Sequence, residues 1–434
     1  MSLTLSRAAL LALPIVLLAF ASPLRAEGRE ALRAWVEAGL AAACPKGLGD
    51  PDRIAAALGN AEILTAEETG RGGRLTRHWL ALSDPARGEL VLTANASVEQ
   101  LQSLVVEAFE LPKGGARRPV VMARADRTCA VVLAREILYD AEGRAETLVH
   151  LDAGLRPTET SEPLNPPVPD GKDPGGITVA LVDSGVNYLL PEIAGRLARD
   201  RRGRSLGYDF WDRDARPFDA NPARSPFLPL RHGTTVAGLL LREAPEIRLL
   251  PFRYPRPDMA RMAELVAAAE GAGAGIVAMA MGSRSRTDWT AFEKAAEARP
   301  DMLFIVSAGN DGQDIDETPV YPASLELTNM LVVTSADDFG RLATGSNWGR
   351  KSVDLMLPAE RLETLDHRGA RVTASGSSYA VPRLAALAAR LWAEHPNWTA
   401  NTLKHAILAR AVVPRIRGQS PVRAGWIPNP ADDG

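Results

Sequence analysis

Three short motifs hold the side chains of this sequence that could carry out a reaction together. They are Asp183-Ser184-Gly185, His232-Gly233-Thr234 and Gly376-Ser377-Ser378. They supply a carboxylate, an imidazole and a hydroxyl, the groups that together make a serine nucleophilic near neutral pH. Because the motifs lie far apart along the chain, only the fold can bring them together.

Each motif by itself has a simpler structural explanation. Asp183 before a glycine is typical of a turn, His232 opens an apolar helical stretch, and Ser378 has the position of a helix cap. However, a lone carboxylate at the end of an apolar strand would be costly to bury, and a histidine partner would remove that cost. All three motifs together, in this order, therefore predict Asp183, His232 and Ser378 as a catalytic triad.

A fourth segment, Ser307-Ala308-Gly309-Asn310, follows a predicted buried strand. The side-chain amide of Asn310 could donate a hydrogen bond to the oxyanion of a tetrahedral intermediate. The alternative is an ordinary turn that ends the strand, for which Gly-Asn is well suited. Asn310 is thus a candidate oxyanion donor.

Apolar runs that alternate with helical segments predict the elements that must position these groups. Strands buried on both faces read as continuous hydrophobic runs, so the second half predicts an α/β fold with a mostly parallel sheet and helices on both faces. Sites in such sheets form at the carboxyl ends of strands, where Asp183 and Asn310 lie. The predicted strands are Ile177–Val182, Ile247–Phe252, Gly275–Met281, Met302–Ser307 and Met330–Ser335. The predicted helices are Thr234–Leu241, Met259–Gly271, Asp288–Arg299 and Tyr379–Trp392, the last with Pro382 in its first turn.

Residues 27–157 predict a smaller α+β domain without a cluster of reactive side chains. Helical spacing covers Arg29–Ala43 and Ser97–Glu110, and a hairpin turn is expected at Asp140–Arg144. Short strands are expected at Val120–Ala123, Cys129–Leu138 and Glu146–Leu151. A Pro- and Gly-rich stretch, 158–176, predicts a linker, followed by a catalytic domain over 177–415 and a loosely packed tail over 416–434.

The first 26 residues have the layout of a secretory signal peptide. Arg7 precedes an apolar run, Ala8–Ala21, which is too short to span a bilayer, and small residues permit cleavage after Ala21 or Ala26. We therefore expect an exported protein, periplasmic or secreted, without a stable membrane anchor once the signal is removed. The 434 residues allow two or three domains, and a net charge of -3 gives no indication of a nucleic-acid partner.

The sequence contains two cysteines, Cys44 and Cys129, both in the N-terminal half. In an oxidising compartment they could form a disulfide, and two small buried thiols are an equally good interpretation. Neither cysteine stands in the setting of a catalytic nucleophile, and metal-binding spacing is absent. No metal ligand is assigned.

From about Gly176 to Ala411 the sequence resembles the subtilisin family of serine proteases (subtilases), in which the catalytic residues follow the order Asp, His, Ser. The resemblance implies a subtilisin-like fold, Asp183, His232 and Ser378 as the triad, and Asn310 in the oxyanion hole. It also implies a polypeptide substrate; calcium binding occurs in the family, but no calcium site can be assigned. The matching segments are Val179–Gly185, His232–Gly238, Ser307–Asn310, Tyr321–Ala323, Ser346–Gly349, Leu357–Pro358 and Gly376–Pro382.

Several positions depart from the family pattern. Ser377 stands where threonine is usual, Tyr379 where methionine is usual, and Thr235 where a second histidine is frequent. The strand that pairs with substrate backbone reads Ala280-Met281-Gly282 rather than Ser-Leu-Gly, but pairing through backbone groups does not depend on side chains. The predicted substrate-binding residues are Ala280, Met281, Gly282, Ser307, Ala308 and Gly309.

Two other functions compete with a serine protease: an esterase and a binding module without catalytic activity. An α/β-hydrolase esterase needs an acid and then a histidine after the nucleophile. After Ser378 the histidines are His395 and His405, and the sole acid before either is Glu394, which is adjacent to His395 and could hardly orient it. A catalytically silent binding module is the remaining alternative. The N-terminal domain is either a pro-segment that blocks the cleft as an inhibitor or a permanent accessory domain, and its size favours an accessory or atypical pro-domain.

Overall fold

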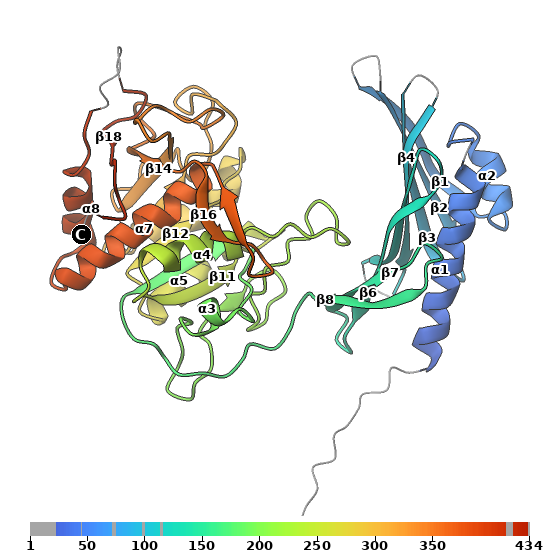
Figure 1. Cartoon of the computed structure of the whole chain (residues 1–434), viewed down its shortest axis with the longest axis horizontal. Helices are drawn as coiled ribbons and strands as arrows, with labels where there is room; N and C mark the ends of the chain where they lie inside the picture. Colours follow the sequence, from blue (N-terminus) through green and yellow to red (C-terminus); the bar gives the residue numbers. More distant parts are fainter. Residues whose placement is uncertain are drawn as a thin grey trace, which may run out of the picture. The chain divides into compact units, whose positions relative to one another are not determined.

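The computed structural model describes residues 23–44, 46–71, 75–97, 100–112, 116–413 and 420–432. The chain forms two compact units (Figure 1). The first contains residues up to Ile137 together with Val149–Ser161, and the second contains Leu138–Leu148 and everything from Glu162 onward. Most of the predicted signal peptide lies outside the described residues, and its role stays a prediction.

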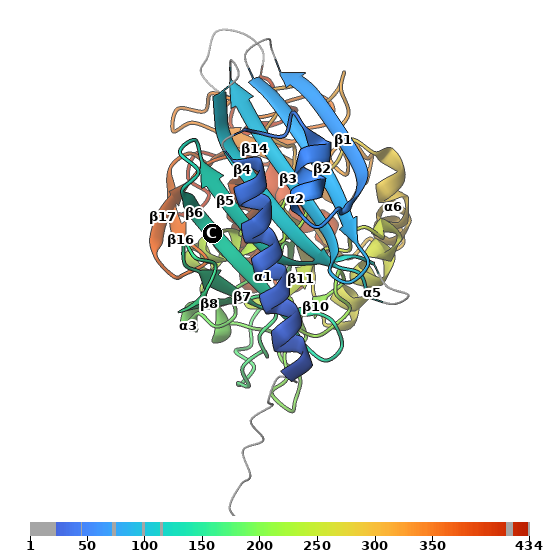
Figure 2. The same ribbon diagram turned by 90° about the vertical axis from the view of Figure 1, so that its right-hand side faces the viewer.

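The first unit holds most of an antiparallel sheet whose eight strands follow in sequence order, with helix α1 across one face (Figure 2). Leu92, Leu104 and Val106 of the sheet form a core with Trp35 and Val36 of α1. The elements are α1 (Pro23–Ala43), α2 (Pro51–Ala57), β1 (Glu62–Arg71), β2 (Leu75–Asp84), β3 (Gly88–Ser97), β4 (Gln100–Glu110), β5 (Arg118–Asp126), β6 (Val131–Tyr139), β7 (Ala145–Leu151) and β8 (Pro157–Pro163). The predicted helix at Arg29–Ala43 and the hairpin turn at Asp140–Arg144 are confirmed.

The predicted helix at Ser97–Glu110 is wrong, because residues 100–110 form strand β4. Leu104, Val106 and Ala108 are fully buried at every second position, which is the period of a strand. Leu104 pairs with Ala94 of β3 and with Ala125 of β5. Pairing with two neighbouring strands thus overrides a local pattern that is also compatible with a helix.

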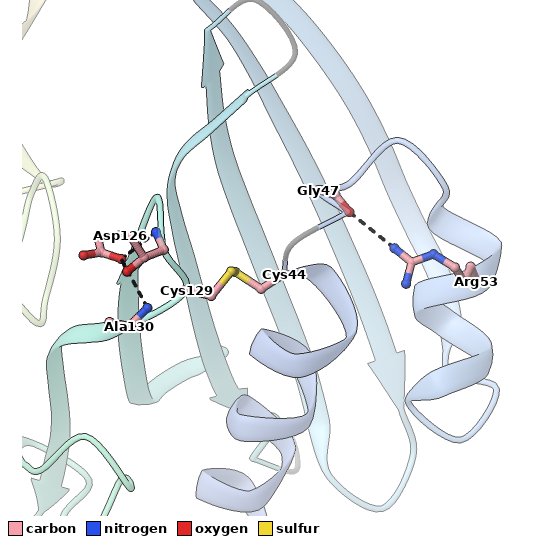
Figure 3. Close-up of a disulfide and its surroundings, with 7 residues drawn as sticks. Cys44, Gly47, Arg53, Asp126, Cys129 and Ala130 are labelled. Carbon is pink, nitrogen blue, oxygen red and sulfur yellow. Dashed lines mark hydrogen bonds between the residues drawn. A yellow bond between two sulfur atoms is a disulfide. The ribbon is translucent and has the colours of Figure 1, made fainter.

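A disulfide joins Cys44, directly after α1, to Cys129 in the turn between β5 and β6 (Figure 3). The two Cα atoms are 5.9 Å apart, and the bridge spans 85 residues of sequence. Asp126 organises the turn, because its carboxylate accepts the N–H groups of Thr128 at 2.8 Å and of Ala130 at 3.2 Å. Of the two interpretations of the cysteines, the structure therefore has the paired one.

The second unit contains a parallel sheet in the order β10-β11-β9-β12-β13-β14-β15-β18, with helices on both faces (Figure 1). Its core strands carry the predicted apolar runs, and all five are confirmed. The strands are β9 (Thr178–Asp183), β10 (Tyr208–Asp209), β11 (Arg248–Arg253), β12 (Ile276–Met279), β13 (Leu303–Ser307), β14 (Met330–Ala336), β15 (Leu355–Pro358) and β18 (Gly425–Trp426). The helices are α3 (Pro191–Ala194), α4 (Gly233–Glu243), η1 (Met259–Arg261), α5 (Met262–Gly271), η2 (Arg286–Trp289), α6 (Thr290–Glu297), α7 (Ser377–Glu394) and α8 (Ala400–Leu408).

The helices divide between the two faces of this sheet according to the alternation of its side chains. Helices α5 and α6 share a core with Val182, Phe252 and Phe304. Helix α7 packs across β12, β13 and β14 and against α4. A separate antiparallel hairpin, β16 (Leu362–Leu365) and β17 (Arg371–Ala374), packs on α4.

Two boundary predictions need correction. Residues 158–163 of the expected linker belong to strand β8 (Pro157–Pro163) of the first sheet. The tail expected to pack loosely contributes β18, which pairs in parallel with β15, and Val422 and Ile427 around it are 2% and 1% exposed. In both cases pairing with a distant strand holds a segment whose Pro and Gly content is typical of a loop.

Helix α7 begins at Ser377, two residues before the predicted start. Pro382 therefore lies in the second turn rather than the first. Because proline has no N–H, the carbonyl of Ser378 lacks the usual helical hydrogen bond from that position. The amino-terminal cap is Gly376, so Ser378 is not a capping residue.

Candidate active site

The carboxylate and the imidazole of the predicted triad are in direct contact. Asp183 is the last residue of β9, and His232 directly precedes α4. The Nδ1 atom of His232 lies 2.8 Å and 2.9 Å from the two carboxylate oxygens of Asp183. The carboxylate of Asp183 is buried, whereas the imidazole of His232 is 36% exposed. The ring therefore contacts the buried carboxylate and is also accessible from solvent.

Glycines allow the two chain segments to approach this closely. A Cβ atom on Gly233 would lie 2.0 Å from the carbonyl oxygen of Gly185, and Gly185 itself has φ of 96°. A larger residue at either position would separate β9 from the start of α4. His232 caps α4 only through its backbone, because its side chain makes no capping hydrogen bond.

The pKa of His232 is strongly perturbed by its surroundings. Burial alone would lower the pKa, because it disfavours the charged imidazolium. The negative charge of Asp183, its hydrogen bond to the ring, and the charge of Asp219 outweigh burial and raise the pKa to about 9. The arrangement therefore stabilises an imidazolium, which is the form that a general base becomes after it takes a proton.

Ser378 and Asn310 are brought together at the amino terminus of α7. Gly376 has φ of 125°, and a Cβ there would lie 3.1 Å from Oδ1 of Asn310. The backbone N–H and the hydroxyl of Ser377 each donate to Oδ1 of Asn310 at 2.9 Å. These two bonds orient the amide of Asn310, so its Nδ2 donor points away from Ser377. Ser378 is the second residue of α7, where backbone N–H groups have no partner within the helix.

Ser377 has a second role through its hydroxyl. The Oγ atoms of Ser377 and Ser307 are 2.7 Å apart, and the proton of Ser377 is already donated to Asn310. Ser307 is therefore the donor in that contact, and its own oxygen accepts the N–H of Gly309 at 3.2 Å. This chain of bonds links the end of β13 to the start of α7.

A cavity of about 180 Å³ contains both Ser378 and Asn310. Of the predicted substrate-binding residues, Ala280, Met281, Gly282, Ser307 and Gly309 line it, whereas Ala308 is fully buried and does not. Sequence reasoning missed four lining residues, which are Ser283, Arg284, Asp311 and Val320. The first three directly follow predicted segments, but Val320 comes from a separate loop and has no sequence signal.

Tyr379, the departure next to Ser378, lies beside the histidine. The centres of the Tyr379 and His232 rings are 6.0 Å apart. Burial, together with the negative charges of Asp183 and Asp219, raises the pKa of Tyr379 to about 12, so its phenol is neutral. Tyr379 therefore forms an uncharged, bulky wall next to the imidazole.

Two further properties concern ions and membranes. Within the described ranges, no group of three or more His, Cys, Asp and Glu side chains could hold a metal ion, and no calcium site is assigned. None of the helices described here is long and apolar enough to cross a membrane.

Part of the chain is similar to known proteins. The model of the subtilase family matches residues 175–426, more than half of the chain. The thermophilic serine proteinase of Bacillus sp. strain AK1 is 29% identical over 242 residues, which cover 52% of this chain and 54% of the relative. Alkaline serine exoprotease A of Vibrio alginolyticus is 26% identical over 256 residues, covering 56% and 43% respectively. The matched region thus spans about half the length of these curated relatives.

Among solved structures, a cold-adapted subtilisin-like serine proteinase is 24% identical with a TM-score of 0.49. The similarity covers 61% of this chain and 93% of that protein.

Proposed function

The chain belongs to the subtilase family of serine proteases, and from this premise we propose that it is an exported endopeptidase that hydrolyses peptide bonds through an acyl-enzyme on Ser378. The observation that carries the proposal is the pairing of Asp183 with Nδ1 of His232 at 2.8 Å, with Ser378 and Asn310 lining one cavity. The oriented imidazole, which acts as a base in its neutral form, and the cavity supply the groups that acyl transfer needs.

The proposed reaction begins with His232 as general base. His232 takes the proton of Ser378 through Nε2 while Asp183 holds Nδ1–H and stabilises the imidazolium. The Oγ of Ser378 attacks the carbonyl carbon of the peptide bond. Nδ2 of Asn310 and the backbone N–H of Ser378 donate to the oxyanion. His232 then gives its proton to the leaving amine. In the second half of the reaction, His232 takes a proton from a water molecule, which attacks the acyl-enzyme. His232 returns that proton to the Oγ of Ser378 as the acid product leaves.

The proposed substrate is a polypeptide that binds in extended form. The segment Ala280–Gly282 borders the cavity and offers backbone N–H and C=O groups for pairing with substrate. A Cβ on Gly282 would lie 2.8 Å from the carbonyl oxygen of Tyr321, so this position requires glycine. Arg284 and Asp311 are exposed charged residues of the lining and would contact a bound chain near its entry.

Export is supported by the sequence layout of the first 26 residues and by the disulfide between Cys44 and Cys129. Disulfides persist in oxidising compartments outside the cytosol. Expression in a bacterial host, followed by fractionation and sequencing of the mature N-terminus, tests the proposal. Protein found only in the cytosol with an intact N-terminus would contradict export.

A covalent probe tests the catalytic proposal. A fluorophosphonate should label the native protein at Ser378 and fail to label Ser378→Ala. The nearby Ser375→Ala provides the matched control, because it removes an exposed hydroxyl three residues away from the proposed nucleophile. Folded protein that is not labelled, and that cleaves no peptide of a mixed library, would favour the alternative of a catalytically silent binding module.

We propose that the N-terminal domain is an accessory or atypical pro-domain; as a pro-domain it would block the cleft until the linker is cut. Mass spectrometry of purified protein over time tests removal of the domain. A new N-terminus between residues 158 and 176 that does not form in Ser378→Ala would identify a pro-segment removed by the enzyme itself. An intact chain with full activity would identify a permanent domain.

A further inference from the structure

A second carboxylate lies behind the Asp183–His232 pair. Asp219 is fully buried in the segment between β10 and α4. Its oxygens accept four hydrogen bonds, from Ser184 Oγ at 2.6 Å, His232 N at 3.2 Å, Thr234 N at 2.9 Å and Thr234 Oγ1 at 2.5 Å. Burial alone would raise the pKa of Asp219, but its interactions with His367, Ser184 and Thr234 outweigh burial and lower the pKa to about 2. Asp219 is therefore ionised at any pH at which the protein would act.

The hydrogen bond to Asp219 sets the direction of the hydroxyl proton of Ser184. Ser184 Oγ lies 2.6 Å from Asp219 and 3.2 Å from Asp183, and a hydroxyl has only one proton to donate. The shorter contact takes that proton, while the oxygen accepts the N–H of Gly233 at 2.9 Å. Asp183 consequently receives no hydroxyl proton from Ser184, and its charge remains available to the imidazole of His232.

Asp219 also holds the backbone from which the imidazole projects. It accepts the N–H groups of His232 and Thr234, which are among the unpaired donors at the amino terminus of α4. A negative charge at this end of a helix is favourable. The carboxylate of Asp219 therefore fixes the backbone at the start of α4, next to the contact between His232 and Asp183.

His367 approaches Asp219 from a different element. It lies in the turn of the β16–β17 hairpin, and its Nδ1 is 3.7 Å from the carboxylate of Asp219. The imidazole is 13% exposed and packs edge-on against Phe218 with ring centres 5.3 Å apart. Its Nδ1 has no hydrogen-bond partner among the described residues, which leaves Asp219 as the polar group that it faces.

The hairpin is itself fixed to the helix that follows His232. Thr364 Oγ1 donates to the carbonyl of Thr235 at 2.6 Å, and a Cβ on Gly238 would lie 2.8 Å from the same hydroxyl. The backbone carbonyl of His367 accepts the side-chain N–H of Asn187 at 2.7 Å. The hairpin thus presents His367 to Asp219 from a fixed position.

From these contacts we infer that Asp219 is a positioning residue for the Asp183–His232 pair and that His367 holds Asp219 in place. The inference rests on the proposed function, since it assigns roles within that reaction. Neither residue contacts the cavity that contains Ser378, so they act through Asp183, Ser184 and the backbone of His232. Arg231 also contacts this region, because its guanidinium donates to the backbone carbonyl of Asp219.

The near-isosteric variant Asp219→Asn tests the inference. An amide nitrogen facing Ser184 would donate to its oxygen and turn the hydroxyl proton toward Asp183, and the charge that favours the imidazolium would be lost. We expect kcat to fall by roughly tenfold to a hundredfold with KM changed by less than about twofold, since the substrate cavity is untouched. The acidic limb of the kcat/KM profile should also move to lower pH.

The matched control is Asp354→Asn. Asp354 is likewise a buried carboxylate, 3% exposed, that accepts a backbone N–H from Val332 at 2.9 Å, but it has no contact with the triad. We expect this variant to lose stability without moving the acidic limb. The peripheral variant His367→Gln should shift the limb in the same direction as Asp219→Asn with a smaller loss of kcat, and it carries the test if Asp219→Asn does not fold.

A readout independent of turnover separates this inference from the proposed function. The pKa of His232 can be followed by NMR, with its signal among the six histidines assigned by its absence in His232→Gln. A lower His232 pKa in Asp219→Asn and His367→Gln, with no change in Asp354→Asn, supports the inference even if the wild-type protein proves inactive. An unchanged pKa and unchanged kcat in folded variants would overturn it. Wild-type protein that a fluorophosphonate does not label would instead contradict the proposed function.

Discussion

The two units differ in where their buried polar side chains lie and in what these side chains contact. Within the described part of the first unit, the buried charged residue is Glu136, which pairs with Arg29 at 2.9 Å and Arg33 at 2.7 Å on helix α1. In the second unit, buried polar groups such as Asp183, Asp219 and Ser377 lie near the carboxyl ends of strands β9 and β13. The first arrangement fastens a helix to a sheet, whereas the second orients groups for the proposed reaction. Substitutions should therefore affect stability in one unit and turnover in the other.

Replacement of the triad carboxylate should give the largest effect. Asp183→Asn retains the shape of the side chain but can no longer stabilise the imidazolium of His232, so we expect kcat to fall by about 10⁴-fold. Turnover of a chromogenic peptide measures this loss, and thermal unfolding of the same sample serves as the control. A loss below tenfold in folded protein would mean that the second unit is not organised around this pair.

Asn310→Ala should have the next largest effect. It removes a side-chain donor from the proposed oxyanion hole, and we expect kcat to fall by about 10²- to 10³-fold, as removal of one such donor does in a subtilisin. KM should change little, because the donor acts on charge that develops during the reaction. Asn329→Ala, a buried asparagine that bonds the carbonyls of Ala296 and Arg299, is the matched control and should affect stability alone.

The pH dependence of activity should follow the titration of His232. Since its pKa is raised to about 9, the imidazole is protonated below that value and cannot accept the proton of Ser378. We expect kcat/KM to rise about tenfold per pH unit between pH 6 and 8 and to level off above about 9. A flat profile over this range would contradict the role of His232 as the base.

The titration of His232 should change stability in the direction opposite to activity: activity rises with pH, whereas the contribution of His232 to stability falls. A histidine whose pKa is raised by folding binds its proton more tightly in the native state. Its contribution to stability is fully present below the unfolded pKa of about 6.5 and is lost as pH rises through about 9. Urea unfolding at several pH values measures this term, and His232→Gln should remove it.

Removal of the disulfide should give the smallest effect on turnover. Cys44→Ala together with Cys129→Ala releases a bridge that spans 85 residues, and we expect the first unit to lose about 2–4 kcal/mol of unfolding free energy. Activity on a short peptide should stay within about twofold, because neither cysteine belongs to the second unit. A larger loss of activity would show that the first unit acts on the catalytic one.

The different burial of the strands in the two units explains which elements could be predicted from sequence. The strands of the second unit are buried on both faces, so their continuous apolar runs marked Thr178–Asp183 and Leu303–Ser307 almost to the residue. The strands of the first unit are buried mainly on one face and are interrupted by polar residues. Residues 100–110 of β4 consequently resembled a helix, and only pairing with β3 and β5 identifies the strand.

The sequence alone determined the family of the chain and the alternation of strands and helices in its second half, and it supplied the residues of the proposed triad and oxyanion donor. These features are local, because a strand, a tight turn and the side chain that follows them are neighbours along the chain. Only the tertiary structure decided that Cys44 and Cys129 pair, that β18 completes the sheet, and that Asp219 and His367 lie behind Asp183. Those contacts join segments that are far apart in sequence. Burial and hydrogen bonding stabilise them in the folded chain, and no local sequence pattern predicts them.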